Sequence, residues 1–162
     1  MNINEISHPN GTYIKLIPDS KSKSILTALQ SQFKIPHPLH PNDLHMTLVY
    51  SRASCPDAVE IEQRFSPIRG TLTRFDYLPN KNIGSQSLVV VLDCPEAVKL
   101  HNYVIKHYGA THDYSSYIPH ITLSYNCYAT ISALTTNPTI TFDNIMVSKN
   151  IPTWKPKESN NK

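Results

Sequence analysis

DLHMTLVY at residues 43–50 and IPHITLSY at residues 118–125 carry the same pattern, H-x-T-L-x-Y, 75 residues apart. A single H-x-T could arise by chance in a chain with eight histidines, but two copies of the longer string require a common cause. β-Branched and aromatic residues favour strands, so each copy is expected to form a β-strand. The simplest cause of the repetition is duplication of a structural unit.

The segments before the two motifs repeat the same order of secondary structure. In the first half, GTYIKLIP (11–18) predicts a strand, and residues 19–33 predict an amphipathic helix because apolar residues recur at helical spacing. In the second half, SLVVVLDC (87–94) predicts a strand, and residues 95–109 predict a helix that opens with proline and closes with glycine. A loop then leads to each motif strand.

A third predicted strand follows each motif and contains Phe-Asp, as TRFDYL at 73–78 and TFDNIMV at 141–147. The order β-α-β-β therefore occurs twice. We expect an α+β fold, a single bilobal domain with pseudo-twofold symmetry, in which two β-α-β-β lobes of antiparallel strands carry outer helices and enclose a central cleft. The expected lobes are residues 11–80 and 85–154, and residues 155–162 form a polar C-terminal tail.

Composition describes a globular protein of one domain. The chain has 162 residues, of which 40% are hydrophobic and 17% are charged, and these values are typical of globular proteins. The net charge of +3 suits a small anionic ligand and is too weak for binding to long nucleic acid. The longest apolar run, LVVVL at 88–92, is far shorter than the ~20 residues of a membrane-spanning helix. The N-terminal residues lack the features of a secretory signal, so a cytoplasmic protein is expected.

The repeated motif places two kinds of side chain where phosphoryl chemistry needs them. Alternate side chains of a strand share a face, so His45 and Thr47 should face one way, and His120 and Thr122 should do the same in the second copy. A pseudo-twofold axis would bring the two faces together across the cleft. Imidazoles, with an ordinary pKa of about 6.5, can then serve as base and acid, while the hydroxyls donate to phosphate oxygens. These four residues are the predicted catalytic set.

Paired H-x-[ST] strands in two β-α-β-β lobes resemble the 2H phosphoesterase superfamily, and the resemblance extends over residues 1–154. It implies a metal-independent enzyme without a cofactor, acting on 2′,3′-cyclic phosphates or on phosphodiesters beside a 2′-OH. Within the superfamily, the short chain, the strand TYIKLI and the ending IPTW are similar to the phage anti-CBASS proteins, which degrade cyclic di- and trinucleotide signals. A cyclic di- or trinucleotide is therefore the expected substrate.

Five further residues are candidates for contact with the substrate. Tyr13 and Lys15 should share the cleft face of the first strand, where an aromatic ring can stack on a base and a lysine can hold a phosphate. Trp154, the single tryptophan of the chain, could close over the cleft or plug the edge of the core. Tyr77 and Tyr117 are further candidates for stacking.

The sequence leaves other interpretations open. His37, His40 and His45 could begin a metal site, although prolines separate them and no fourth ligand follows at suitable spacing. The remaining histidines are interpreted as surface or loop residues: His8, His101, His107 and His112. The alternative functions are an RNA 2′,3′-cyclic phosphodiesterase that acts on RNA ends and a protein that sequesters a nucleotide without cleaving it.

Overall fold

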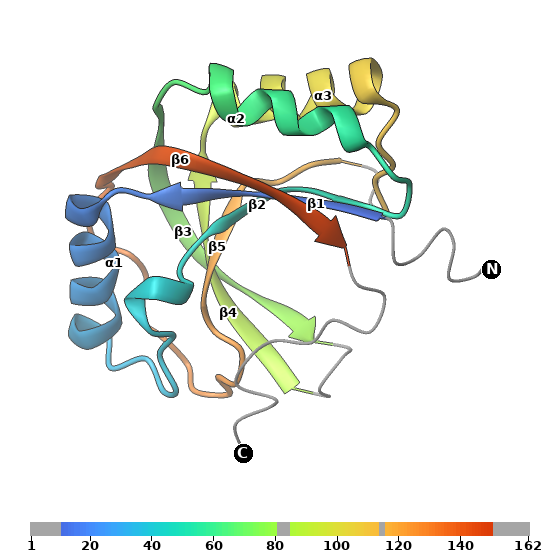
Figure 1. Cartoon of the computed structure of the whole chain (residues 1–162). Coiled ribbons are helices and arrows are strands. Elements are labelled where there is room, and N and C mark those ends of the chain that lie inside the picture. The colour runs from blue at the N-terminus through green and yellow to red at the C-terminus, as the bar shows by residue number, and fades with distance from the viewer. Residues whose placement is uncertain (1–10, 81–84, 114–115, 151–162) are drawn as a thin grey trace.

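A computed structural model describes residues 11–80, 85–113 and 116–150, and strands form its centre (Figure 1). The first half contributes β1 (Gly11–Pro18), α1 (Ser20–Gln32), β2 (Met46–Ser51) and β3 (Ile68–Asn80). The second half contributes β4 (Ser85–Asp93), α3 (Pro95–Tyr108), β5 (His120–Ser124) and β6 (Thr139–Asn150). Short helical segments are η1 (Pro41–Asp43), η2 (Pro56–Glu60) and α2 (Ile61–Arg64). The predicted α+β fold, with β-α-β-β written twice, is confirmed.

The two long helices begin and end at residues suited to those positions. The side chain of Asp19 caps α1 by accepting a hydrogen bond of 2.7 Å from the Ser22 N–H. The helix α3 starts with Pro95 and is followed by Gly109, whose φ of 71° is a left-handed conformation that glycine adopts without strain. Within the described residues, no helix has both the length and the apolar composition needed to span a membrane.

The strands form one closed antiparallel barrel in the order β1-β2-β5-β4-β3-β6. Exchanging each strand of the first half for its counterpart in the second half leaves this circular order unchanged, which is the pseudo-twofold symmetry expected from the duplicated sequence. Helix α1 lies on one side of the barrel, and α2 and α3 lie together on another (Figure 1).

The third strand of each half pairs with the first strand of the other half. β6 pairs along the length of β1, from Gly11–Asn150 to Pro18–Phe142, and β3 pairs in the same way with β4. The expected lobes, residues 11–80 and 85–154, therefore describe the repeat in the sequence, whereas the sheet interleaves the two halves. The β3–β4 pairing is local, because the strands are consecutive and Asn80 pairs with Ser85. The β1–β6 pairing joins segments far apart in the chain, and no local sequence signal specifies it.

The two motif strands, β2 and β5, lie side by side in the ring (Figure 1). Their ladder in the described chain consists of the pair Met46–Ile121, the two residues that follow the motif histidines. Both side chains are fully buried, as is Leu123, and Leu48 is 1% exposed. One face of each motif strand thus belongs to the core, and the opposite face carries the histidines and threonines.

Candidate active site

The four motif side chains form a compact set around the pseudo-twofold axis. The antiparallel register set by the Met46–Ile121 pair places His45 opposite Thr122 and Thr47 opposite His120. The two histidines are close enough for His120 to act on the pKa of His45 and lower it. All four side chains are partly exposed, so a ligand can reach them.

Both histidines are fixed by the same hydrogen bond. His45 Nδ1 lies 2.8 Å from the carbonyl oxygen of Asp43, and His120 Nδ1 lies 2.8 Å from the carbonyl oxygen of Ile118. A carbonyl only accepts, so Nδ1 carries the proton in both rings. Nε2 is then the atom that exchanges a proton with a ligand, and each strand presents this atom from the same position of its motif.

Tyr13 joins the first motif through its hydroxyl group. The oxygen lies 2.9 Å from His45 Nε2 and 3.1 Å from Thr47 Oγ1. When His45 is neutral, its Nε2 accepts the phenol proton, and the Thr47 hydroxyl donates to the phenol oxygen. Burial raises the pKa of Tyr13 to about 12, so the phenol remains protonated near neutral pH. The structure therefore places Tyr13 on the face predicted for it, in direct contact with the motif.

The surroundings of His45 favour its neutral form. Burial is the main cause that lowers the pKa of His45 below its ordinary value, although the hydrogen bond to the Asp43 carbonyl opposes this effect. The nearby charges of Lys15 and His120 lower this pKa further. A lowered pKa favours the neutral imidazole near pH 7, and a neutral imidazole can accept a proton.

The site is chemically asymmetric although the backbone is nearly symmetric. Lys15 is the β1 partner of Thr47, and the corresponding partner of Thr122 in β4 is Val89. Lys15 is partly exposed, whereas Val89 is 1% exposed. The predicted lysine therefore does lie beside the motif, and it makes the His45 side of the site the more cationic one.

Tyr117 contacts the first motif through the backbone. Its hydroxyl donates to the carbonyl oxygen of Thr47 at 2.8 Å, and its ring stacks on His101 with the centroids 4.3 Å apart and the planes at 6°. The expectation that His101 is a surface or loop residue is wrong, because its side chain is only 3% exposed. The sequence did contain a signal, because Ala97, His101 and Val104 recur at helical spacing and form the buried face of α3.

Two other candidate residues are not shown in contact with the histidines. The Tyr77 hydroxyl donates to the Ala129 carbonyl and accepts from the Ile131 N–H, each at 2.9 Å, so it fastens the loop after β5. Trp154 lies outside the described residues. A substrate contact for either residue stays a prediction.

The histidines of the HPLHPNDLH segment serve different purposes. His40 Nδ1 accepts a hydrogen bond from the Asn42 N–H and caps η1, and His37 is an exposed residue with φ of 49°. In the described ranges, no three His, Cys, Asp or Glu side chains are grouped so that they could hold a metal ion. His45 is engaged with Asp43 and Tyr13 instead.

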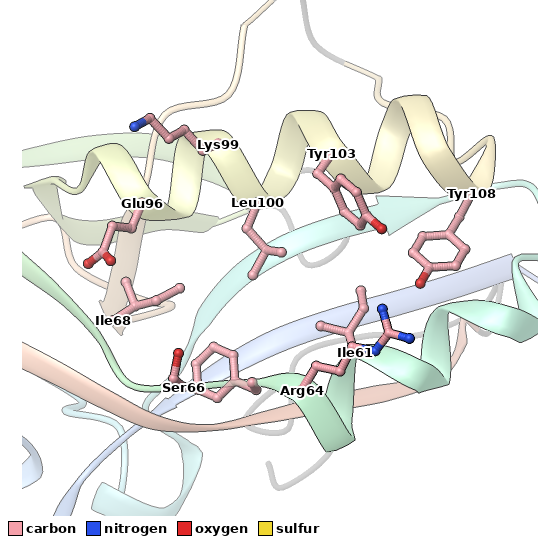
Figure 2. Close-up of a pocket in the computed structure, with 10 residues that line it drawn as sticks. Ile61, Arg64, Ser66, Ile68, Glu96, Lys99, Leu100, Tyr103 and Tyr108 are labelled. Carbon is pink, nitrogen blue, oxygen red and sulfur yellow. The ribbon is translucent and has the colours of Figure 1, made fainter.

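A separate cavity of about 520 Å³ opens between α2 and α3 (Figure 2). Its lining includes Phe65, Leu100, Tyr103 and Tyr108, and none of the motif residues takes part. The Tyr108 hydroxyl donates to Glu60. Its described lining contains no histidine, so the cavity lacks the pair of imidazoles that the motif strands provide.

The fold is shared with several solved structures, one of which is described as a phosphoesterase. TT0787 of Thermus thermophilus matches with a TM-score of 0.65 and 18% identity over 91% of both chains. LigT of E. coli, in its complex with 3′-AMP, matches with a TM-score of 0.56 and 17% identity over 86% of this chain and 87% of LigT. The chain therefore shares its overall architecture with these two proteins.

Sequence similarity identifies the family of this chain. The model of the anti-CBASS protein Acb1 family matches residues 10–151. The Acb1 protein of Vibrio phage KVP40 is 32% identical over 126 residues, which cover 78% of this chain and 80% of that protein. The Acb1 protein of Salmonella phage S16 is 33% identical over 117 residues, which cover 72% and 73%. The chain belongs to the anti-CBASS protein Acb1 family.

Proposed function

We propose that this protein is a metal-independent phosphodiesterase that opens cyclic di- and trinucleotide signals in the cytoplasm of an infected bacterium, and so counteracts CBASS signalling. Membership of the anti-CBASS family supports the biological role, and the phage origin of its relatives supports the setting. The observation that supports the proposed reaction is the matching orientation of the two histidines. Each is tied through Nδ1 to the carbonyl two residues earlier, so that Nε2 remains for proton transfer.

The first step is attack by a ribose 2′-OH on the adjacent 3′-phosphate. This nucleophile is tethered to its target, which removes much of the entropy cost of bringing two groups together. His45 Nε2 takes the 2′-OH proton as the O2′–P bond forms, and His120 Nε2–H gives a proton to the 5′-oxygen as the P–O5′ bond breaks. The ring is then opened and carries a 2′,3′-cyclic phosphate at one end and a 5′-OH at the other.

The assignment of His45 as the base rests on its surroundings. Burial and the Lys15 charge lower the pKa of His45 and keep it neutral, and a neutral imidazole can accept a proton. For this step the 2′-OH must replace the Tyr13 hydroxyl, which lies 2.9 Å from His45 Nε2. Thr47 and Thr122 would donate to the non-bridging phosphate oxygens.

Hydrolysis of the cyclic phosphate uses the same pair with the roles reversed. His120, now neutral, takes a proton from water, and His45, now protonated, returns its proton to the 2′-oxygen. The P–O2′ bond breaks, and the product ends in a 3′-phosphate. The two steps together restore both histidines to their starting protonation states.

The charge distribution favours a small substrate over a long RNA backbone. Arg52 forms an ion pair with Asp113 at 3.1 Å, and Arg74 lies 3.8 Å from Asp76. These arginines are therefore partly neutralised by their own neighbours. Lys15, by contrast, lies beside the motif as the strand partner of Thr47 and can bind a phosphate there.

A panel of substrates tests the proposal. The protein is incubated with cyclic dinucleotides, cyclic trinucleotides and an RNA that ends in a 2′,3′-cyclic phosphate, and the products are identified by mass spectrometry. Opened rings with 3′-phosphate or 2′,3′-cyclic phosphate ends are expected from the cyclic oligonucleotides. Cleavage of the RNA end alone would indicate the RNA-processing function, and binding without turnover of any substrate would indicate sequestration.

A further inference from the structure

The two motif strands share little backbone pairing with each other. The β2–β5 ladder in the described chain is the pair Met46–Ile121, whereas β1–β6 and β3–β4 pair along most of their lengths. A small shift of one motif strand along the other would move one histidine–threonine pair relative to its partner pair. Contacts outside this ladder must therefore hold the catalytic face in register.

Two stacked side chains from the second half bind consecutive carbonyls of the first motif strand. His101 of α3 donates from Nδ1 to the carbonyl oxygen of Leu48 at 2.7 Å. Tyr117 donates to the carbonyl oxygen of Thr47 at 2.8 Å. His101 is buried and its ring lies flat on that of Tyr117, so both donors are held rigidly, and the His101 bond is shielded from competing water.

The first half makes the corresponding contact in the opposite direction. Gln30 of α1 is 4% exposed and donates from Nε2 to the carbonyl oxygen of Leu123 at 3.0 Å. Leu48 and Leu123 occupy the same position in the H-x-T-L motif. Each long helix therefore donates a buried hydrogen bond to the motif-leucine carbonyl of the other half, although one helix uses a histidine and the other a glutamine.

We propose that His101, together with Tyr117, is a positioning residue for the first motif and that Gln30 is the positioning residue for the second. The helices hold each motif strand from the opposite half, so the two catalytic faces stay aligned across the axis. All three residues act through the backbone of the motifs. The inference rests on the proposed function for its turnover assay, and a displacement of about 1 Å in such a site can cost about 10²-fold in rate.

Variants of His101 separate the hydrogen bond from simple filling of space. His101→Leu retains apolar volume and removes the donor, whereas His101→Asn places an amide N–H where Nδ1 stood. We expect His101→Leu to lower kcat for a cyclic dinucleotide about 10-fold or more with KM changed less than about 3-fold, and His101→Asn to recover most of that loss. Wild-type kcat in His101→Leu, or a loss that His101→Asn does not reduce, would overturn the proposal.

The histidine signals in NMR spectra test the alignment without any substrate. In protein labelled with ¹⁵N at histidine, Tyr117→Phe, which removes one oxygen and keeps the ring, should shift the imidazole signals of His45 and leave those of His120 in place. Gln30→Leu should do the reverse. The proposal would be contradicted if neither imidazole signal shifted, or if both shifted equally in each variant. This test remains available even if His101→Leu does not fold.

These two measurements also separate the inference from the proposed function. If the wild-type protein turned over no cyclic oligonucleotide, the proposed function would fail, while the NMR comparison would still decide whether the helices hold the motifs. If the wild-type protein were active and the NMR pattern were absent, the positioning role alone would be wrong.

Discussion

Replacing each motif histidine with asparagine removes the ring nitrogen Nε2 and keeps the hydrogen bond that Nδ1 makes. The asparagine Nδ2 group corresponds to histidine Nδ1, so His45→Asn and His120→Asn should still donate to the carbonyls of Asp43 and Ile118, which lie 2.8 Å from Nδ1 in the native site. Nε2, the proton-transfer atom, is lost. The asparagine variants therefore test the chemistry with less structural damage than alanine, which would also forfeit a hydrogen bond worth about 1 kcal/mol.

The expected loss in turnover is large for each single variant. A positioned acid or base contributes about 10²–10⁴-fold, which corresponds to about 3–5 kcal/mol of transition-state stabilisation. His45 and His120 act in the same proton-transfer cycle. The turnover rate of the double variant should therefore be only slightly lower than that of the less active single variant. Single-turnover cleavage of a cyclic dinucleotide measures these rates, and isothermal titration calorimetry checks that the substrate still binds.

A substrate with sulfur in place of the bridging 5′-oxygen distinguishes the two roles. A thiolate, with a pKa of about 8.5 for its thiol, leaves without help from an acid. The sulfur substrate should therefore restore the rate of His120→Asn and leave His45→Asn slow. Rates within about 10-fold of wild type in either variant on the natural substrate would refute the two-imidazole mechanism, and rescue of His45→Asn would reverse the assignment of base and acid.

Other predictions follow from the same geometry. A cyclic dinucleotide with 2′-deoxyribose at the cleaved linkage should bind and resist cleavage, because the attacking hydroxyl is missing; rapid cleavage, or a product ending in a 5′-phosphate seen by mass spectrometry, would exclude the proposed attack. Activity should persist after exhaustive dialysis against EDTA, since two histidines supply the proton transfers; a loss that zinc or manganese restores would revive a metal role for the histidines of residues 37–45. Acid should destabilise the fold. Burial lowers the pKa of both His45 and His101, so their contribution to stability is present above their ordinary pKa of about 6.5 and is lost as the pH falls through the lowered values. Urea unfolding at pH 7.5 and pH 5.5 measures this loss of stability, which should be smaller in His101→Asn. The same pH dependence in His101→Asn as in the wild type would contradict the role of His101 in this loss.

The sequence alone determined which residues share a face. The two-residue period of a strand places His45 with Thr47 and His120 with Thr122, and the structure brings all four to one side of β2 and β5, with Met46 and Ile121 buried behind them. The order of helices and strands could also be predicted from the sequence, because the second half repeats the order of the first. These properties depend on residues close together in the chain.

The tertiary structure decided everything that depends on contacts between distant segments. β6 pairs with β1, which lies at the other end of the described chain, since sheet pairing over long separations is settled by the packing of the whole core rather than by local preference. The Tyr13 hydroxyl reaches His45 across 32 residues, and the inward turn of His101 onto the Leu48 carbonyl spans 53. Such hydrogen bonds form because burial leaves a polar group no water to bind, so the fold must supply its partner.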